Sequence, residues 1–296
     1  MTLAASAGCG DACARHAWRP LARNSSMNGA ANRHVGFACG STRAHRTHAR
    51  MPADKTMNGA ILHTAFDIVA WAAAGLSMYW VMRRSGRQFP TVPASDWRYI
   101  AALVFGAGVG AMVLGTANLW LSQESGVARS IEGAIAGGIL AVELYKRSAQ
   151  ITARTGARFA LPLAVGVAVG RIGCYLSGLG DFTYGTPTAL PWGHDFGDAI
   201  PRHPVQLYES AAMAAFALVY FVQVRRGNVL VIANGFYLAV GFYGAQRFLW
   251  EFFKPYAPLI GPLTLFHLLS IAIVVYAAYM IVTAPRARAA HDRAFA

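Results

Sequence analysis

The sequence is short of charged residues. Asp, Glu, Lys and Arg make up only 13% of its 296 residues, whereas 55% are hydrophobic. Soluble domains usually contain about 25% charged residues, so a soluble globular fold is disfavoured. Instead, the sequence predicts an all-α polytopic membrane protein with about seven transmembrane helices, because most of its apolar segments approach the roughly 20 residues that span a bilayer. These segments are 62–82, 98–120, 131–146, 158–177, 205–223, 229–250 and 262–283.

The sequence also lacks the motifs of nucleotide and metal sites. It has no Walker, Rossmann or zinc-type spacing, so we expect no cofactor and no metal. Three of its four cysteines, Cys9, Cys13 and Cys39, lie in the first 40 residues without ligand-like spacing. We interpret the fourth, Cys174, as a small packing residue within an apolar segment.

The net charge of +13 suits a nucleic-acid binder, but the positions of the basic residues do not. Beyond residue 56, basic segments alternate along the chain with loops that are poorer in Lys and Arg. Cytoplasmic loops of membrane proteins carry such an excess, so we predict no nucleic-acid partner, an outer N-terminus and a cytoplasmic C-terminus. The basic segments are 83–87, 146–158, 225–227 and 286–293.

Three parts of the chain are expected. Residues 1–56 are basic without apolar periodicity, and we interpret them as a disordered extension or as a translation start assigned too early. Met51 and Met57 precede the first apolar segment, and a later start removes the conflict between this positive charge and an outer N-terminus. Residues 57–285 form the membrane domain, and residues 286–296 form a basic cytoplasmic tail.

On this topology, ionisable residues within the apolar segments gather in the outer half of the membrane. Such groups are costly in a bilayer, so their common depth predicts a polar cavity open to the outer leaflet. The alternative is a set of snorkelling side chains and salt bridges near helix ends. Glu143 is the exception, near the inner end of its helix. The outer group is His63, Asp67, Glu132, Arg171, Arg202, His203, Glu209, Arg247, Glu251 and His267.

Two arginines are the best candidates for binding an anion. Arg171 follows an uncharged run, and its guanidinium can hold a phosphate bidentately; the alternative is an ion pair, for instance with Glu209 or Glu251. Arg247 and Glu251 are four residues apart on one helix face, which also suits a structural pair.

Weaker signals come from three other places. Arg202 and His203 precede a helix start and form a possible anion cradle, or a plain cap. His63 and Asp67 are spaced as a histidine base and its orienting carboxylate, or as packing residues. We interpret three acidic residues of the loop 178–204 as turn formers. These are Asp181, Asp195 and Asp198.

Four ordered blocks together resemble the prolipoprotein diacylglyceryl transferase family. The blocks are GRIGCYLSG, TYGTPTALPWG, PRHPVQLYE and YGAQRFLWEFFK. The resemblance implies transfer of the diacylglyceryl group of phosphatidylglycerol to the lipobox cysteine of a prolipoprotein signal peptide, with release of glycerol phosphate. It also places the reaction at the outer face of the bacterial inner (plasma) membrane.

The resemblance further implies roles for single residues. Arg171 and Arg247 bind the lipid phosphate and stabilise its departing charge, and Glu251 orients Arg247. Residues within the four blocks are expected to line the substrate site together with Arg171. These are Gly170, Gly173, Gly185, Arg202, His203 and Tyr243.

The chain departs from the family pattern at positions that handle protons. Cys174 replaces an asparagine, Glu132 replaces a histidine that is often suggested as the thiol's base, and Phe66-Asp67 falls near a family tyrosine. The base is therefore Glu132, His203, or His63 with Asp67. Two alternatives stay open: the same lipid donor with another acceptor, or a lipid-binding or anion-binding membrane protein without catalysis.

Overall fold

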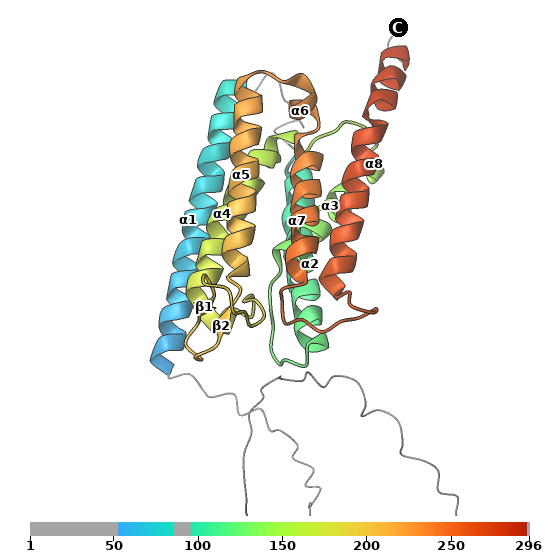
Figure 1. The fold of residues 1–296 in the computed structure, drawn as a ribbon. Coiled ribbons are helices and arrows are strands. Elements are labelled where there is room, and N and C mark those ends of the chain that lie inside the picture. Colours follow the sequence, from blue (N-terminus) through green and yellow to red (C-terminus); the bar gives the residue numbers. More distant parts are fainter. Residues whose placement is uncertain (1–52, 86–95, 295–296) are drawn as a thin grey trace, which may run out of the picture. The chain divides into compact units, whose positions relative to one another are not determined.

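Helices form nearly all of the ordered structure. The computed structural model describes residues 53–85 and 96–294, so residues 1–52 of the predicted extension lie outside the described part (Figure 1). The described residues form seven long helices and a five-residue helix, α6 (Val229–Ala233). The long helices are α1 (Ala53–Ser85), α2 (Trp97–Leu121), α3 (Ile131–Ser148), α4 (Ala160–Ser177), α5 (Val205–Arg225), α7 (Gly235–Glu251) and α8 (Leu265–Ala294).

Each predicted apolar segment corresponds to a helix, with three main differences. The first helix begins earlier, at Ala53, and the last continues to Ala294 through the predicted tail. The sixth segment is divided, because Asn234 ends α6 before α7 begins. Five helices are long and apolar enough to cross a membrane. The chain is therefore a helical polytopic membrane protein.

Four pairs of helices pack closely against each other. The closest pairs are α2 with α3, α1 with α4, α7 with α8, and α4 with α5 (Figure 1). The main apolar core lies around α4, α5 and α7, where Ala164, Met213 and Val240 have no exposed surface. Small residues dominate α4, so its neighbours approach it closely, as is usual for helices in lipid.

Glycines bring α2 and α3 into backbone contact. Each helix carries two glycines four residues apart, Gly106 and Gly110 facing Gly133 and Gly137. A methyl group added at Gly137 would lie 2.2 Å from the carbonyl oxygen of Gly106, and one at Gly110 would lie 2.3 Å from that of Gly133. Only glycine fits at this crossing, which is the small-residue packing of membrane helices.

The loops that connect the helices meet at two opposite ends. At one end, the loop after α7 contacts the loops after α2 and α4: Ala257 N donates to Ser122 Oγ at 3.2 Å, and Thr186 N donates to the carbonyl of Phe253 at 2.6 Å. At the other end, Arg154 donates to Asn234 Oδ1 at 3.0 Å. The predicted basic segment 146–158 therefore lies at the end opposite the loop 178–204.

Both strands found among the described residues lie in the loop 178–204. Strands β1 (His194–Asp195) and β2 (Pro201–Arg202) pair antiparallel, so the fold is not purely helical. Asp195 Oδ1 accepts hydrogen bonds from the backbone N–H groups of residues 197, 198 and 199. These bonds lower the pKa of Asp195, and they confirm its predicted role as a turn former.

Candidate functional site

A cluster of buried charges occupies the end of the helices near the loop 178–204. Arg171 of α4 lies 2.5 Å, Nε to Oε2, from Glu209 of α5. Arg247 of α7 lies 2.7 Å, Nη1 to Oε1, from the same carboxylate. Glu209 therefore joins the two arginines that the sequence singled out.

Arg247 has further acidic partners. Its Nε donates to Glu132 Oε2 of α3 at 3.1 Å, and its Nη2 lies 2.7 Å from Glu251 Oε2 on its own helix. The second oxygen of each of these carboxylates accepts a hydrogen bond from a hydroxyl group. Ser270 of α8 donates to Glu132 Oε1, and Thr264 donates to Glu251 Oε1, each at 2.6 Å. One guanidinium thus links three acidic side chains from three helices.

Lys254 is a third cation in this cluster, which the sequence analysis missed. It follows the end of α7, and its Nζ lies 2.9 Å from Glu209 Oε1. Burial and then the neighbouring Arg247 lower the pKa of Lys254 to about 8. A sequence signal was available, because Lys254 is the last residue of the block YGAQRFLWEFFK that contains Arg247.

The cluster is closed to solvent and balanced in charge. Arg171 is 6% exposed, Arg247 2% and Glu209 0%. Three cations (Arg171, Arg247 and Lys254) face three carboxylates (Glu132, Glu209 and Glu251). A buried charge is tolerated when it is paired and hydrogen-bonded, but loss of one partner leaves the other uncompensated.

Polar side chains next to the cluster have atoms without a protein partner. Among the described residues, Gln206 Oε1, Tyr243 Oη and both amide atoms of Gln246 are buried and accept or donate no hydrogen bond. Tyr243 lies within electrostatic range of Arg171 and Arg247. Buried polar atoms usually find partners, so this set can bind a polar group of a substrate.

The structure brings together most of the predicted catalytic residues, with His203 as the exception. Arg171, Arg247, Glu251 and Glu132 belong to the cluster. His203 lies in the loop before α5, where its Nδ1 is 3.4 Å from Tyr208 Oη and its ring packs 4.9 Å from that of Phe253. The pairing of Arg171 with Glu209 agrees with the alternative of an ion pair.

Arg202 also lies apart from the cluster. Its Nη2 donates to Asp198 Oδ2 at 2.5 Å, and its guanidinium lies 5.0 Å from the ring centre of Tyr184. The interpretation of Asp198 as only a turn former was therefore incomplete, because this carboxylate also holds Arg202 in the loop.

The glycines of the predicted site serve close packing in this structure. A methyl group at Gly173 would lie 2.6 Å from Phe66 Cβ of α1, and one at Gly185 would lie 2.4 Å from the carbonyl oxygen of His203. Gly170 has more room, with Ala70 Cβ at 3.8 Å from such a group. Gly173 and Gly185 thus fix how α1 and the loop before α5 approach the cluster.

A second polar group lies beside the first, and here two interpretations were incomplete. Asp181 Oδ1 is 3.4 Å from His63 Nε2, so Asp181 does more than form a turn. Cys174 is buried as expected, but its Sγ lies 3.7 Å from the same His63 nitrogen and 4.0 Å from Arg171 Nη1. His63 Nδ1 meets Asp67 Oδ2 at 3.1 Å, as their spacing predicts.

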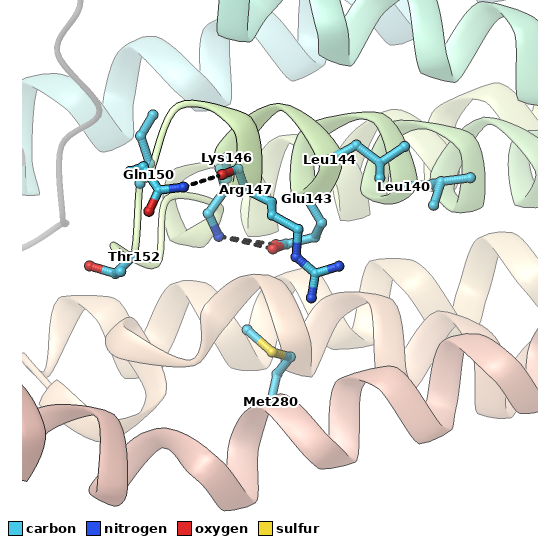
Figure 2. A pocket seen from close by; sticks show the side chains of 9 residues that line it. Leu140, Glu143, Leu144, Lys146, Arg147, Gln150, Thr152 and Met280 are labelled. Atoms are coloured by element: carbon cyan, nitrogen blue, oxygen red, sulfur yellow. Dashed lines mark hydrogen bonds and ion pairs between the residues drawn. The ribbon is translucent and has the colours of Figure 1, made fainter.

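Glu143 lies at the far end of α3. It borders a cleft of about 620 Å³, and Figure 2 shows Lys146 reaching its carboxylate, with Nζ 3.1 Å from Oε1. Tyr276 of α8 donates to the same oxygen at 3.2 Å. Glu143 thus lies apart from the predicted site residues, which do not line this cleft.

The comparisons with known proteins agree with these observations. A model of the family described as prolipoprotein diacylglyceryl transferase matches residues 65–283. The chain belongs to this family. The match covers all the clustered residues, from Glu132 to Ser270. The four sequence blocks thus indicated the right family.

Known phosphatidylglycerol–prolipoprotein diacylglyceryl transferases resemble the chain over most of its length. The one from Geobacter sulfurreducens is 31% identical over 220 residues, which are 66% of this chain and 81% of the relative. That from Nitratidesulfovibrio vulgaris is 30% identical over 63% of this chain and 74% of the relative. That from Cupriavidus pinatubonensis is 29% identical over 77% and 95%. No solved structure matches the chain.

Proposed function

We propose that this member of the prolipoprotein diacylglyceryl transferase family transfers the diacylglyceryl group of phosphatidylglycerol to the lipobox cysteine of prolipoproteins. Glycerol phosphate is the second product, and the reaction needs no nucleic acid. The observation that carries the proposal is the convergence of Arg171 and Arg247 on Glu209 within a chain of this family. The names of the relatives support both substrates.

The reaction takes place at the outer face of the bacterial inner membrane in this proposal. Seven helices cross the bilayer: the five apolar ones together with α3 and α7, whose Glu132, Arg247 and Glu251 are paired inside the protein. The basic segments 146–158 and 225–227 then lie in the cytoplasm, in accordance with the excess of Lys and Arg there. The N-terminus of α1 is outside and the C-terminus of α8 is inside.

The arginines supply the electrostatic part of catalysis. The departing glycerol phosphate gains negative charge as its C–O bond breaks, and cations held in a dry site stabilise that charge more strongly than they would in water. Arg171 uses Nε for Glu209, which leaves its Nη groups for the phosphate. Glu251 and Glu132 hold the Arg247 guanidinium in place.

The test is transfer of label from lipid to peptide. Membranes containing the protein receive phosphatidylglycerol labelled in an acyl chain and a lipobox peptide. We expect label on the peptide cysteine, and a reduction of about 100-fold or more with Arg247→Lys, because an ammonium cannot reproduce the fork of contacts. Glu143→Gln, at the other end of α3, is the matched control and keeps wild-type transfer.

Each other result identifies an alternative. Release of glycerol phosphate without label on the peptide shows another acceptor for the same lipid. Binding of phosphatidylglycerol by folded protein with neither product shows a lipid-binding protein without catalysis. Unchanged transfer by Arg247→Lys contradicts the role given to the cluster.

A further inference from the structure

Three side chains of different segments converge beside Arg171. His63 comes from α1, Cys174 from α4, and Asp181 from the 3₁₀ helix that follows α4, η2 (Gly178–Asp181). One nitrogen, one sulfur and one oxygen of these residues all lie within 4.8 Å of one another. The resemblance places an asparagine at the position of Cys174, so this cysteine is a departure of the chain from the family pattern.

Two of the three separations come close to the edges of a zinc coordination tetrahedron. Zinc binds imidazole nitrogen and carboxylate oxygen at about 2.0 Å and thiolate sulfur at about 2.3 Å. A tetrahedral angle then separates nitrogen from sulfur by about 3.5 Å and nitrogen from oxygen by about 3.3 Å. The observed separations from His63 Nε2 are 3.7 Å to Cys174 Sγ and 3.4 Å to Asp181 Oδ1. The second is long for a hydrogen bond.

The outer contacts of two of the three residues are those of metal ligands. A histidine that binds a metal through one nitrogen usually donates its other N–H to a carboxylate, which fixes the ring. His63 Nδ1 meets Asp67 Oδ2 at 3.1 Å in this way. Asp181 is held likewise, because Thr183 Oγ1 donates to its Oδ2 at 2.8 Å and leaves Oδ1 toward His63.

The group is open on one side, unlike the arginine cluster. The His63 side chain is 21% exposed and that of Asp181 is 22% exposed, whereas Cys174 is buried. Three protein ligands with one accessible position are the pattern of catalytic zinc sites. Arg171 Nη1 lies 4.0 Å from Cys174 Sγ, so a phosphate on Arg171 would lie next to the metal.

We propose that His63, Cys174 and Asp181 bind a zinc ion whose fourth position takes the thiol of the acceptor cysteine. The role of the fourth position rests on the proposed function; the metal site does not. A thiol that binds a metal loses its proton, here to water. The zinc-bound sulfur attacks the glycerol carbon that carries the phosphate ester. A C–S bond forms, and the C–O bond breaks with its electron pair on oxygen. Glycerol phosphate then leaves as a dianion.

Metal binding is tested first, without reference to activity. Purified full-length protein is equilibrated with zinc and desalted, and its zinc content is measured; cobalt(II) then replaces zinc as a spectroscopic probe. We expect about one zinc per chain and a thiolate-to-cobalt absorption band. Both are lost in Cys174→Ser and His63→Ala. Asp67→Asn, which removes only the orienting carboxylate, weakens zinc binding by about 10–100-fold.

The other cysteines provide the matched control. A Cys9→Ser, Cys13→Ser, Cys39→Ser triple variant keeps the zinc and the cobalt band, because its metal site is intact. Thermal unfolding in detergent verifies that every variant is folded. Folded wild-type protein without zinc, or a cobalt band that persists in Cys174→Ser, overturns the proposal.

Transfer to the lipobox peptide then tests the role of the metal. We expect a zinc chelator to abolish transfer and added zinc to restore it, with glycerol phosphate release following the same course. Full transfer by metal-free protein contradicts the zinc site's role and leaves the proposed function standing. Zinc binding at Cys174 without any transfer retains the metal site but refutes thiol activation together with the proposed function.

Discussion

The two ends of α3 each hold a glutamate, in opposite surroundings. Glu132, in the first turn, is 1% exposed and bonds to Arg247 and Ser270. Glu143, three turns later, has a side chain that is 38% exposed and pairs with Lys146 beside an open cleft. The comparison shows that two charges on one helix can differ widely in how far their surroundings exclude water. Glu143 is open to water although Lys146 is only 7% exposed, so this pair should cost less to break than one in which both partners are buried.

The largest effect should come from the centre of the buried end. Glu209→Gln keeps the shape of the side chain but removes the carboxylate that Arg171, Arg247 and Lys254 share. We expect the free energy of unfolding to fall by about 3–5 kcal/mol, measured by unfolding in detergent micelles. Glu143→Gln is the matched control and should change it by about 0–1 kcal/mol. Equal losses in the two variants would remove the distinction between the two ends.

The free energy of unfolding should depend on pH because Lys254 is buried in the charged cluster. Its pKa in the folded protein, about 8, lies below the ordinary value of 10.5. Between these values the unfolded chain binds more protons, so the unfolding free energy of the wild type rises with pH relative to that of Lys254→Met. The difference has a slope of up to about 1.4 kcal/mol per pH unit. Parallel pH curves for the two proteins would contradict the burial of this charge.

The smallest expected effect concerns how α3 is held against α2. Gly137→Ala places a methyl group 2.2 Å from the Gly106 oxygen, so the helices must separate. We expect a loss of about 1–3 kcal/mol in unfolding free energy. Gly108→Ala is the control. A methyl group added at Gly108 meets nothing within 4 Å, and alanine favours a helix by about 1 kcal/mol over glycine. A stable Gly137→Ala would show that the contact can relax.

The pattern of apolar segments predicted the helices well, because a span of lipid fixes their length and composition. The same pattern predicted that ten ionisable residues share one depth around an open cavity; of these, Arg171, Arg247, Glu251 and Glu132 meet in a closed cluster instead. It could not predict which helices are neighbours. Glu209 was therefore considered only as one of two partners for Arg171. Ser270 was missed, because a single serine in the apolar α8 carries no signal of a distant glutamate.

The group around Cys174 was missed for a related reason. The sequence offered His63 with Asp67 as a local pair, since a helix fixes the distance between residues four apart. Cys174 and Asp181 approach this pair only because α1 packs along α4, with Gly173 of α4 against Phe66 of α1. Such contacts between distant segments depend on tertiary packing, which spacing along one helix does not encode. The predicted absence of a metal site rested on spacing alone.

The partners of Glu132 also set an order for biogenesis. Along the chain, Arg247 follows this carboxylate by 115 residues and Ser270 by 138 residues. An unpaired carboxylate at membrane depth costs a few kcal/mol. In a nascent chain, Glu132 therefore lacks these partners until α7 and α8 have been made. It gains its full set of buried partners only once the chain has reached Ser270.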